Sequence, residues 1–336
     1  MEILSTSDTD LRRAAASLTA GFLVAFPTET VYGLGGDAFN PVSIAKIFEA
    51  KQRPSFDPLI IHIAEQDAVF RIADRSSMNE TLMKRLSILA GRFWPGPLTV
   101  VLPKRREIPN IATAGLTSVA VRFPSHPAAQ ALIRYSTGAV AAPSANRFGC
   151  LSPTRAEHVK SQLGDKVDFI IDGGKTKVGL ESTILDLVQD PPQILRLGGI
   201  PVEDIEPLIG PVVLSLQSSP GAPLSPGQSK NHYAPRTPLV LHKHGELDTV
   251  PPEPDEGRLY YSRSKSGVVA SGRIRVLSES PDPVEAAANL FDMLHELDNL
   301  GLRLIRAEEA PASGLGDAIN DRLRRAESGP PQNGRV

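Results

Sequence analysis

The sequence predicts an α/β protein: a twisted mixed sheet with packed helices, followed by a long linker and a smaller, Rossmann-like α/β domain. Strand-like and helix-like patterns alternate through the first part of the chain. A stretch rich in Pro, Gly and Ser follows, and strand and helix patterns then resume. We therefore expect domains at 1–207 and 238–327, a linker at 208–237 and a disordered tail at 328–336.

The helices of the first part are predicted by their start and stop signals. One begins after the N-cap candidates Ser7–Asp10 and stops at Gly21. Another begins at the Asn40 cap and must end before Pro54, because a residue that precedes proline disfavours the helical conformation. Helical patterns also cover Asn79–Phe93 and Arg155–Leu163.

Short apolar runs bounded by turn residues are expected as strands. In the first part these are Phe22–Phe26, Leu59–Ala64, Leu98–Leu102, Ser118–Phe123, Ala139–Ala142, Phe169–Ile171, Thr183–Leu187 and Ile194–Leu197. In the second part the expected strands are Pro238–Leu241, Arg258–Tyr261, Gly267–Ala270 and Ile274–Leu277, with helices at Val284–Leu300 and Leu315–Ala326.

Composition narrows the class of protein. The 336 residues suffice for two domains, and 41% apolar with 22% charged residues is typical of a globular chain. The longest apolar runs, such as Pro58–Ala64, have the length of strands, and Met1–Ser5 lacks a secretory pattern. The single cysteine, Cys150, excludes an intramolecular disulfide and a cysteine-built metal site. We expect a cytoplasmic protein with no membrane partner.

The segment Phe26–Gly36 leaves a strand and carries threonines, a carboxylate, a tyrosine and glycines. Hydroxyl groups and backbone amides in such a turn can line a small polar ligand. The alternative is an ordinary turn. A Walker A loop is excluded, because no Gly-Lys-Ser/Thr follows.

Two cations, Lys51 and Arg53, stand two residues apart where a helix must end. Side chains so placed can clamp a polyphosphate. The alternative is a favourable interaction of the cations with the C-terminus of the helix.

Two strands carry isolated polar residues. His62 shares a strand face with Ile60 and Ala64, as a hydrogen-bonded core histidine would. Arg122 lies within an apolar strand and needs an anionic partner, which is either a protein carboxylate or a bound one. Pro143–Asn146 follows a strand, as a ligand-contacting loop would.

The remaining polar segments favour local structural roles. Glu181–Thr183 is interpreted as a turn, and Trp94 belongs to a rigid Pro-Gly turn. No metal site is expected, because we interpret His242 and His244 as surface positions of the second domain and not as ligands.

Together these motifs resemble the YrdC-domain family of threonylcarbamoyl-AMP synthases over about residues 8–207. The residues that carry the resemblance are Phe26–Leu34, Lys51–Pro54, Pro58–Ile63, Pro95–Thr99, Val121–Pro124 and Pro143–Asn146. The linker segments Ser225–Gly227 and His232–Pro235 and the helix Gly314–Leu323 resemble the long, two-domain form of the family.

The resemblance implies an adenylate-forming reaction. L-threonine, bicarbonate and ATP, with Mg²⁺ on the phosphates, give L-threonylcarbamoyl-AMP and pyrophosphate. The product supplies a tRNA threonylcarbamoyl-transferase machinery, and a weak contact with tRNA is open. Catalysis is then expected from positioning and charge stabilisation, without a side-chain nucleophile.

The resemblance also implies the site residues. Those around L-threonine are Thr30, His62, Arg122, Ala142 and Ser182. Those around ATP are Arg53, Asp57, Ser118, Ser144, Ser152, Arg196 and Tyr233, with Lys51 and Arg53 nearest the phosphates as catalytic residues. Asp57 departs from the family pattern, in which we expect asparagine, and a carboxylate near phosphates is unfavourable unless a cation offsets it. We also expect the linker to fold back over the nucleotide.

Two other functions are weighed. The first is a carbamoyltransferase that forms a carbamoyl adenylate, although this chain lacks the additional domains with metal-ligating histidines that such enzymes carry. The second is an RNA-binding module. A net charge of −2 and 5% aromatic residues argue against it, whereas a local basic groove would favour it.

Overall fold

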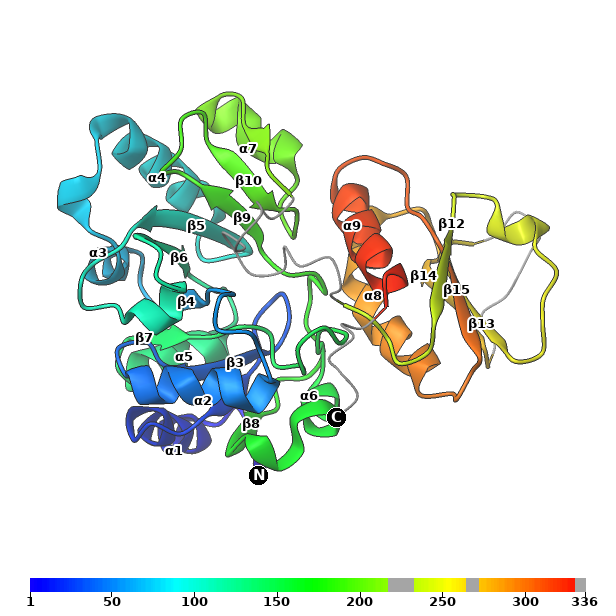
Figure 1. Cartoon of the computed structure of the whole chain (residues 1–336), viewed down its shortest axis with the longest axis horizontal. Coiled ribbons are helices and arrows are strands. Elements are labelled where there is room, and N and C mark those ends of the chain that lie inside the picture. Colours follow the sequence, from blue (N-terminus) through cyan, green and yellow to red (C-terminus); the bar gives the residue numbers. More distant parts are fainter. Residues whose placement is uncertain (217–232, 264–271, 330–336) are drawn as a thin grey trace. The chain divides into compact units, whose positions relative to one another are not determined.

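The computed structural model describes residues 1–216, 233–263 and 272–329. The chain divides into two compact units (Figure 1). The first unit comprises Met1–Arg147, Pro153–Thr176 and Glu181–Ser229, and the second comprises Phe148–Ser152, Lys177–Leu180 and Lys230–Val336. Two short segments from the first part of the sequence thus cluster with the second unit, which no sequence pattern indicated.

The helices of the first unit begin where side chains can cap them. Ser7, Asn40 and Asn79 each accept a hydrogen bond from a backbone N–H of the first turn. The α-helices are α1 (Asp8–Thr19), α2 (Pro41–Lys51), α3 (Val69–Ile72), α4 (Glu80–Phe93), α5 (Pro127–Tyr135), α6 (Ala156–Leu163) and α7 (Val202–Ile209). Short 3₁₀ turns lie at Gln66–Ala68, Arg75–Ser77, Asn110–Thr113 and Gly164–Lys166.

The strands of the first unit form one mixed sheet, which confirms the predicted fold class. Their order is β1-β8-β2-β3-β7-β4-β6-β5-β9-β10-β11, with parallel and antiparallel neighbours (Figure 1). The bounds are β1 (Glu2–Leu4), β2 (Val24–Phe26), β3 (Gly33–Asp37), β4 (Ile60–Ile63), β5 (Leu98–Pro103), β6 (Ser118–Arg122), β7 (Ala139–Ala141), β8 (Phe169–Ile171), β9 (Thr183–Asp186), β10 (Gln193–Arg196) and β11 (Val213–Leu214). Regular structure therefore continues into the range predicted as linker.

The glycine-rich segment is a strand and only in part a turn. β3 pairs antiparallel with β2, with Val24 opposite Gly35. A Cβ atom on Gly35 would lie 2.9 Å from the side chains of Phe26 and Val140, so glycine is required for this close approach.

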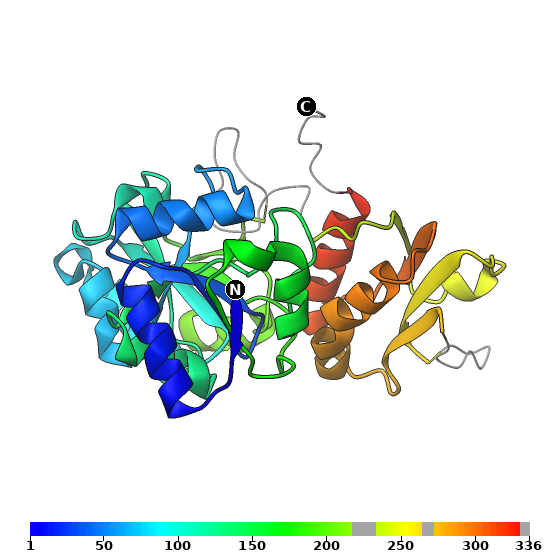
Figure 2. The same ribbon diagram turned by 90° about the horizontal axis from the view of Figure 1, so that it is seen from below.

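Helices cover the sheet unequally. α1 and α5 pack on one face of the half that contains β2, β7 and β8. α2, α3, α4, α6 and α7 pack on the opposite face. In Figure 2, α1 (dark blue) and α2 (lighter blue) lie on opposite sides of the strands. On the α1 face, the strands β4, β6, β5, β9 and β10 carry a small apolar cluster with no helix residue among its described members: Ile60, Ala120, Val101, Ile184 and Leu195.

The second unit has a small parallel sheet, as its Rossmann-like prediction requires. The strand order is β12-β15-β13-β14, with β12 (Leu239–His242), β13 (Glu256–Ser262), β14 (Ile274–Ser278) and β15 (Leu304–Glu308). Its helices are α8 (Pro283–Asp298) and α9 (Leu315–Glu327), and a 3₁₀ turn lies at Leu247–Thr249. The predicted strand Gly267–Ala270 lies outside the described residues. None of the helices in the described ranges has the length and apolar character needed to cross a bilayer.

Candidate functional site

A row of polar side chains crosses the sheet beside the small apolar cluster. His62 of β4 and Thr99 of β5 both pair in register with Arg122 of β6. Ser182, which immediately precedes β9, places its Oγ 2.7 Å from Thr99 Oγ1. Because side chains alternate along a strand, this row shares the face of Ile60, Ala120 and Val101. An apolar floor bordered by convergent polar groups is typical of a ligand site.

Arg122 has a protein carboxylate as partner. Its Nη2 donates to Glu29 Oε1 at 2.8 Å, and its Nε donates to the Gly96 carbonyl at 3.3 Å. The other carboxylate oxygen of Glu29 accepts from the Ser125 N–H at 3.0 Å. Within the part of the chain that the structure describes, Arg122 Nη1 makes no hydrogen bond. This nitrogen can therefore contact a second carboxylate.

His62 is a buried, neutral imidazole. Burial and the nearby positive charge of Arg122 lower the pKa of His62 to about 3. Its Nδ1 has no hydrogen-bond partner among the described residues, unlike that of an ordinary core histidine. The ring of Phe26 meets the imidazole edge-on at 6.1 Å between centroids. The histidine thus carries a buried polar atom beside Arg122 that a ligand could satisfy.

The remaining residues of the predicted threonine set are Thr30, which lies in the turn after β2, and Ala142. Thr28 Oγ1 and Thr30 Oγ1 are 2.8 Å apart, and Glu29 between them reaches Arg122. The Ala142 N–H donates to the Ile60 carbonyl at 2.9 Å, which places Ala142 beside β4. The structure therefore brings Thr30, His62, Arg122, Ala142 and Ser182 to one region of the first unit.

Lys51 donates hydrogen bonds to the loop that follows β7. It ends α2 with its side chain buried, and its Nζ donates to the carbonyls of Ser144 and Asn146, each at 2.5 Å. The amide oxygen of Asn146 lies 3.4 Å from the same nitrogen. To contact a phosphate, Lys51 Nζ would either give up one of these acceptors or bind the phosphate in addition to them.

Arg53 and Arg196 make further contacts in the predicted ATP set. Arg53 Nη2 lies 2.9 Å from Asp57 Oδ1, with both side chains buried. Arg196 donates from Nη2 to Ser182 Oγ at 3.1 Å, which links the two predicted sets. Ser118 begins β6, whereas Arg122 ends it, so these two residues are about 13 Å apart along the strand.

Ser152 and Tyr233 belong to the second unit. The Ser152 carbonyl lies 3.1 Å from His295 Nε2. Tyr233 has φ of 67° and is buried, with the Phe291 ring at 5.6 Å and the Arg322 guanidinium at 4.9 Å. Its predicted contact with ATP stays a prediction. The linker residues Ser225–Gly227 and His232 lie outside the described residues.

Three polar residues of the site were not singled out from the sequence. Glu29, Thr99 and Asn146 lie inside quoted motifs, but their partners are distant in the chain. Alternation along β5 would have indicated Thr99, because it is the polar residue on the Val101 face. The partners of Glu29 and Asn146 have no comparable local signal.

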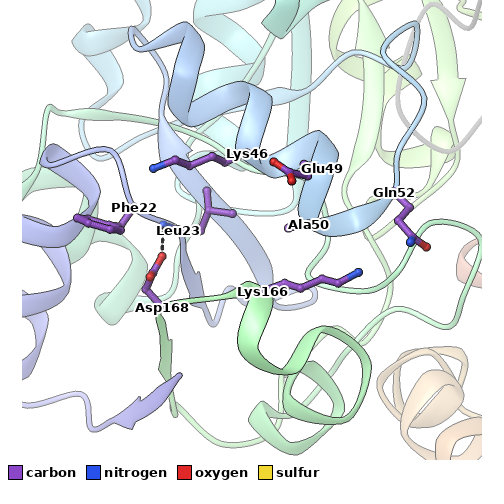
Figure 3. Close-up of a pocket in the computed structure, with 8 residues that line it drawn as sticks. All are labelled: Phe22, Leu23, Lys46, Glu49, Ala50, Gln52, Lys166 and Asp168. Carbon is purple, nitrogen blue, oxygen red and sulfur yellow. Dashed lines mark hydrogen bonds between the residues drawn. The ribbon is translucent and has the colours of Figure 1, made fainter.

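A separate pocket of about 550 Å³ contains none of the predicted site residues (Figure 3). It is lined by Phe22, Leu23, Lys46, Glu49, Ala50, Gln52, Lys166 and Asp168. Lys46 Nζ donates to the Gly21 carbonyl at 2.7 Å, and Asp168 accepts from the Leu23 N–H at 2.9 Å. These contacts have local structural roles, and we assign the pocket no function.

Comparison with known proteins identifies similar chains along the whole length. A family model named Sua5_yciO_yrdC and described as "Telomere recombination" matches residues 16–198, and the model for the threonylcarbamoyl-AMP synthase C-terminal domain matches 200–328. The threonylcarbamoyl-AMP synthases of Pyrococcus abyssi and Bacillus subtilis are each 41% identical, over 94% and 97% of this chain and 93% and 95% of theirs. The crystal structure of P. abyssi Sua5 complexed with L-threonine superposes with a TM-score of 0.86 at 38% identity, covering 97% of both chains.

Proposed function

The chain belongs to the threonylcarbamoyl-AMP synthase family, and we propose that it forms L-threonylcarbamoyl-AMP and pyrophosphate from L-threonine, bicarbonate and ATP. The observation that carries the proposal is the in-register row His62–Arg122–Thr99 on an apolar floor, with Glu29 holding Arg122. The crystal structure of P. abyssi Sua5 complexed with L-threonine supports an amino-acid substrate.

The chemistry needs two steps. The amine of threonine adds to the carbon of bicarbonate, and loss of water leaves an N-carboxylate. An oxygen of this carboxylate then attacks the α-phosphorus of ATP, and the bond to the departing pyrophosphate breaks. Neither step needs a side-chain nucleophile, so the residues act by positioning the reactants and by stabilising charge.

We assign the row on the sheet to threonine. Nη1 of Arg122 would contact the amino-acid carboxylate, while Glu29 and the Gly96 carbonyl keep the guanidinium plane in place. Neutral His62 would offer its Nδ1 for hydrogen bonding to the same ligand. Ser182 and Thr30 add hydroxyl groups.

We assign the buried cations to ATP. Lys51, Arg53 and Arg196 would stabilise the charge of the phosphates and of departing pyrophosphate. Mg²⁺ would enter with ATP and neutralise charge on the phosphate oxygens. Asp57 does not fit a magnesium ligand, because Arg53 already contacts it and the charges of Lys51 and Arg196 act on it.

The proposed product defines the partner. A carbamic–phosphoric anhydride is an activated carbamoyl donor, and we expect a separate transferase machinery to consume it on a tRNA adenosine. Because ATP and tRNA meet in the cytoplasm, we expect the reaction there. Direct contact of this chain with tRNA would be weak, since its net charge is −2.

The proposal is tested by incubating the full chain with labelled bicarbonate, threonine and ATP and separating the nucleotides chromatographically. We expect label in a threonine-dependent adenylate. Label that appears only when labelled carbamoyl phosphate replaces bicarbonate and threonine would indicate the carbamoyltransferase alternative.

A further inference from the structure

Asp57 is a buried carboxylate whose surroundings are unusual. Oδ1 lies 2.9 Å from Arg53 Nη2, yet neither carboxylate oxygen accepts a hydrogen bond in the described part of the chain. Arg53 donates to the backbone, from Nε to the Asp57 carbonyl at 3.2 Å and from Nη2 to the Pro58 carbonyl at 3.0 Å. Arg53 and Asp57 are therefore joined by charge more than by hydrogen bonding.

This arrangement is costly for folding. A buried carboxylate without hydrogen bonds loses the solvation of its charge and regains only part of it from a nearby cation. Burial raises the pKa of Asp57, and the positive charges of Arg53, Lys51 and Arg196 oppose that rise. An amide of the same shape would avoid the cost of burying a charge, so the carboxylate calls for a role beyond packing.

The three cations are those that we assigned to the phosphates of ATP. Together with Asp57 they carry a net charge of +2, and without its carboxylate they would carry +3. In a buried site this difference acts strongly on a polyanion, because water screens it little. A cation cluster that binds pyrophosphate too tightly would retain the product after the adenylate has formed.

Resting on the proposed function, we propose that Asp57 is an internal counter-anion that weakens the hold of Lys51, Arg53 and Arg196 on pyrophosphate and so speeds product release. Asp57 need not touch the nucleotide. It acts through Arg53, and we therefore class it as a positioning residue.

The test compares the wild-type chain with Asp57→Asn, which keeps the shape and removes the charge. Calorimetry with pyrophosphate, and separately with α,β-methylene-ATP, should show roughly tenfold tighter binding to the variant, as expected for one charge removed at close range in a buried site. Product inhibition by pyrophosphate should strengthen by a similar factor, while the dissociation constant of threonine stays unchanged. Asp57→Ser serves as a second neutral variant if the first fails to fold.

Asp186→Asn is the matched control. Asp186 is also a buried carboxylate of the first unit, and its Oδ1 accepts from the Val188 N–H at 2.8 Å. Its substitution should leave pyrophosphate affinity unchanged.

Two results would overturn the inference. If pyrophosphate binding to Asp57→Asn were unchanged or weaker while wild type formed the adenylate, Asp57 would only hold Arg53 in place, and the proposed function would stand. If neither protein bound pyrophosphate or the ATP analogue, the inference and the nucleotide assignment would fall together.

Discussion

Arg122 and Glu29 form a buried ion pair across two motifs that lie 93 residues apart in the chain, with Nη2 2.8 Å from Oε1. The pair orients the guanidinium on the sheet face beside His62. The sequence left open whether the partner of Arg122 is a protein carboxylate or a bound one. The structure shows a protein carboxylate, that of Glu29, and Nη1 remains available for a bound carboxylate.

Arg122→Lys should weaken threonine binding far more than ATP binding. Lysine carries a single point charge, whereas the guanidinium group of arginine can contact Glu29 and a ligand at the same time. Loss of one charge-assisted contact costs about 1.5–3 kcal/mol, or roughly 10- to 150-fold in affinity. Calorimetry with each substrate checks this prediction, and an equal effect on both ligands would assign Arg122 to the fold alone.

Lys51→Met should lower both turnover and stability. The substitution removes the Nζ donor from the carbonyls of Ser144 and Asn146, and the loss of a hydrogen bond to a buried acceptor costs about 1–3 kcal/mol. Steady-state rates and thermal unfolding measure the two effects.

Lys46→Met is the matched control, because Lys46 lies on the same helix and donates to the Gly21 carbonyl. Its loss should affect stability only. A normal rate for a well-folded Lys51→Met protein would show that Lys51 has no part in catalysis.

Acid should destabilise the protein through His62. The pKa of His62 is lowered from 6.5 to about 3, so the unfolded chain binds a proton below pH 6.5 that the folded chain excludes until near pH 3. Stability from this group is complete above pH 6.5 and falls as the pH drops, by up to about 1.4 kcal/mol per pH unit. His62→Gln should show a shallower loss of free energy of unfolding between pH 6.5 and 4.5. Parallel curves for the two proteins would contradict the assignment of a neutral, buried imidazole.

Tyr233→Ala should reduce adenylate formation more than Tyr233→Phe. The ring packs between Phe291 and Arg322 and has a left-handed backbone conformation, which is costly for a non-glycine residue. Phenylalanine keeps the aromatic ring and with it part of the predicted nucleotide contact, whereas alanine removes the ring. Apparent ATP constants of both variants equal to that of wild type would leave Tyr233 with a packing role only.

The elements with strong local signals were predicted from the sequence to within a few residues. The helices α2 and α4 have side-chain caps and regular apolar spacing, and β4 is a continuous apolar run around His62. β3 was missed because glycine disfavours strands, and pairing with β2 together with the tight fit against Phe26 outweighs that preference. Tertiary packing determined the element there.

The residues of the site likewise differ in how far the sequence predicts them. Residue types within motifs indicated Lys51, Arg53 and Arg122, whereas their partners depend on pairing over long sequence separations. Lys51 reaches acceptors 93 and 95 residues away. Local sequence patterns carry no information on contacts between residues so far apart in the chain. The hydrogen bonds of Lys51 to the loop and of Arg122 to Glu29 could therefore be found only in the folded chain.

The exchange of labelled pyrophosphate into ATP tests the central claim most directly, because it reports reversible adenylate formation. With the full chain, we predict exchange that requires both threonine and bicarbonate, that is strongly reduced in Arg122→Lys at a fixed threonine concentration, and that recovers when threonine is raised. Exchange that proceeds equally well without threonine, or no exchange with all substrates present, would contradict the assignment of this chain as a threonylcarbamoyl-AMP synthase.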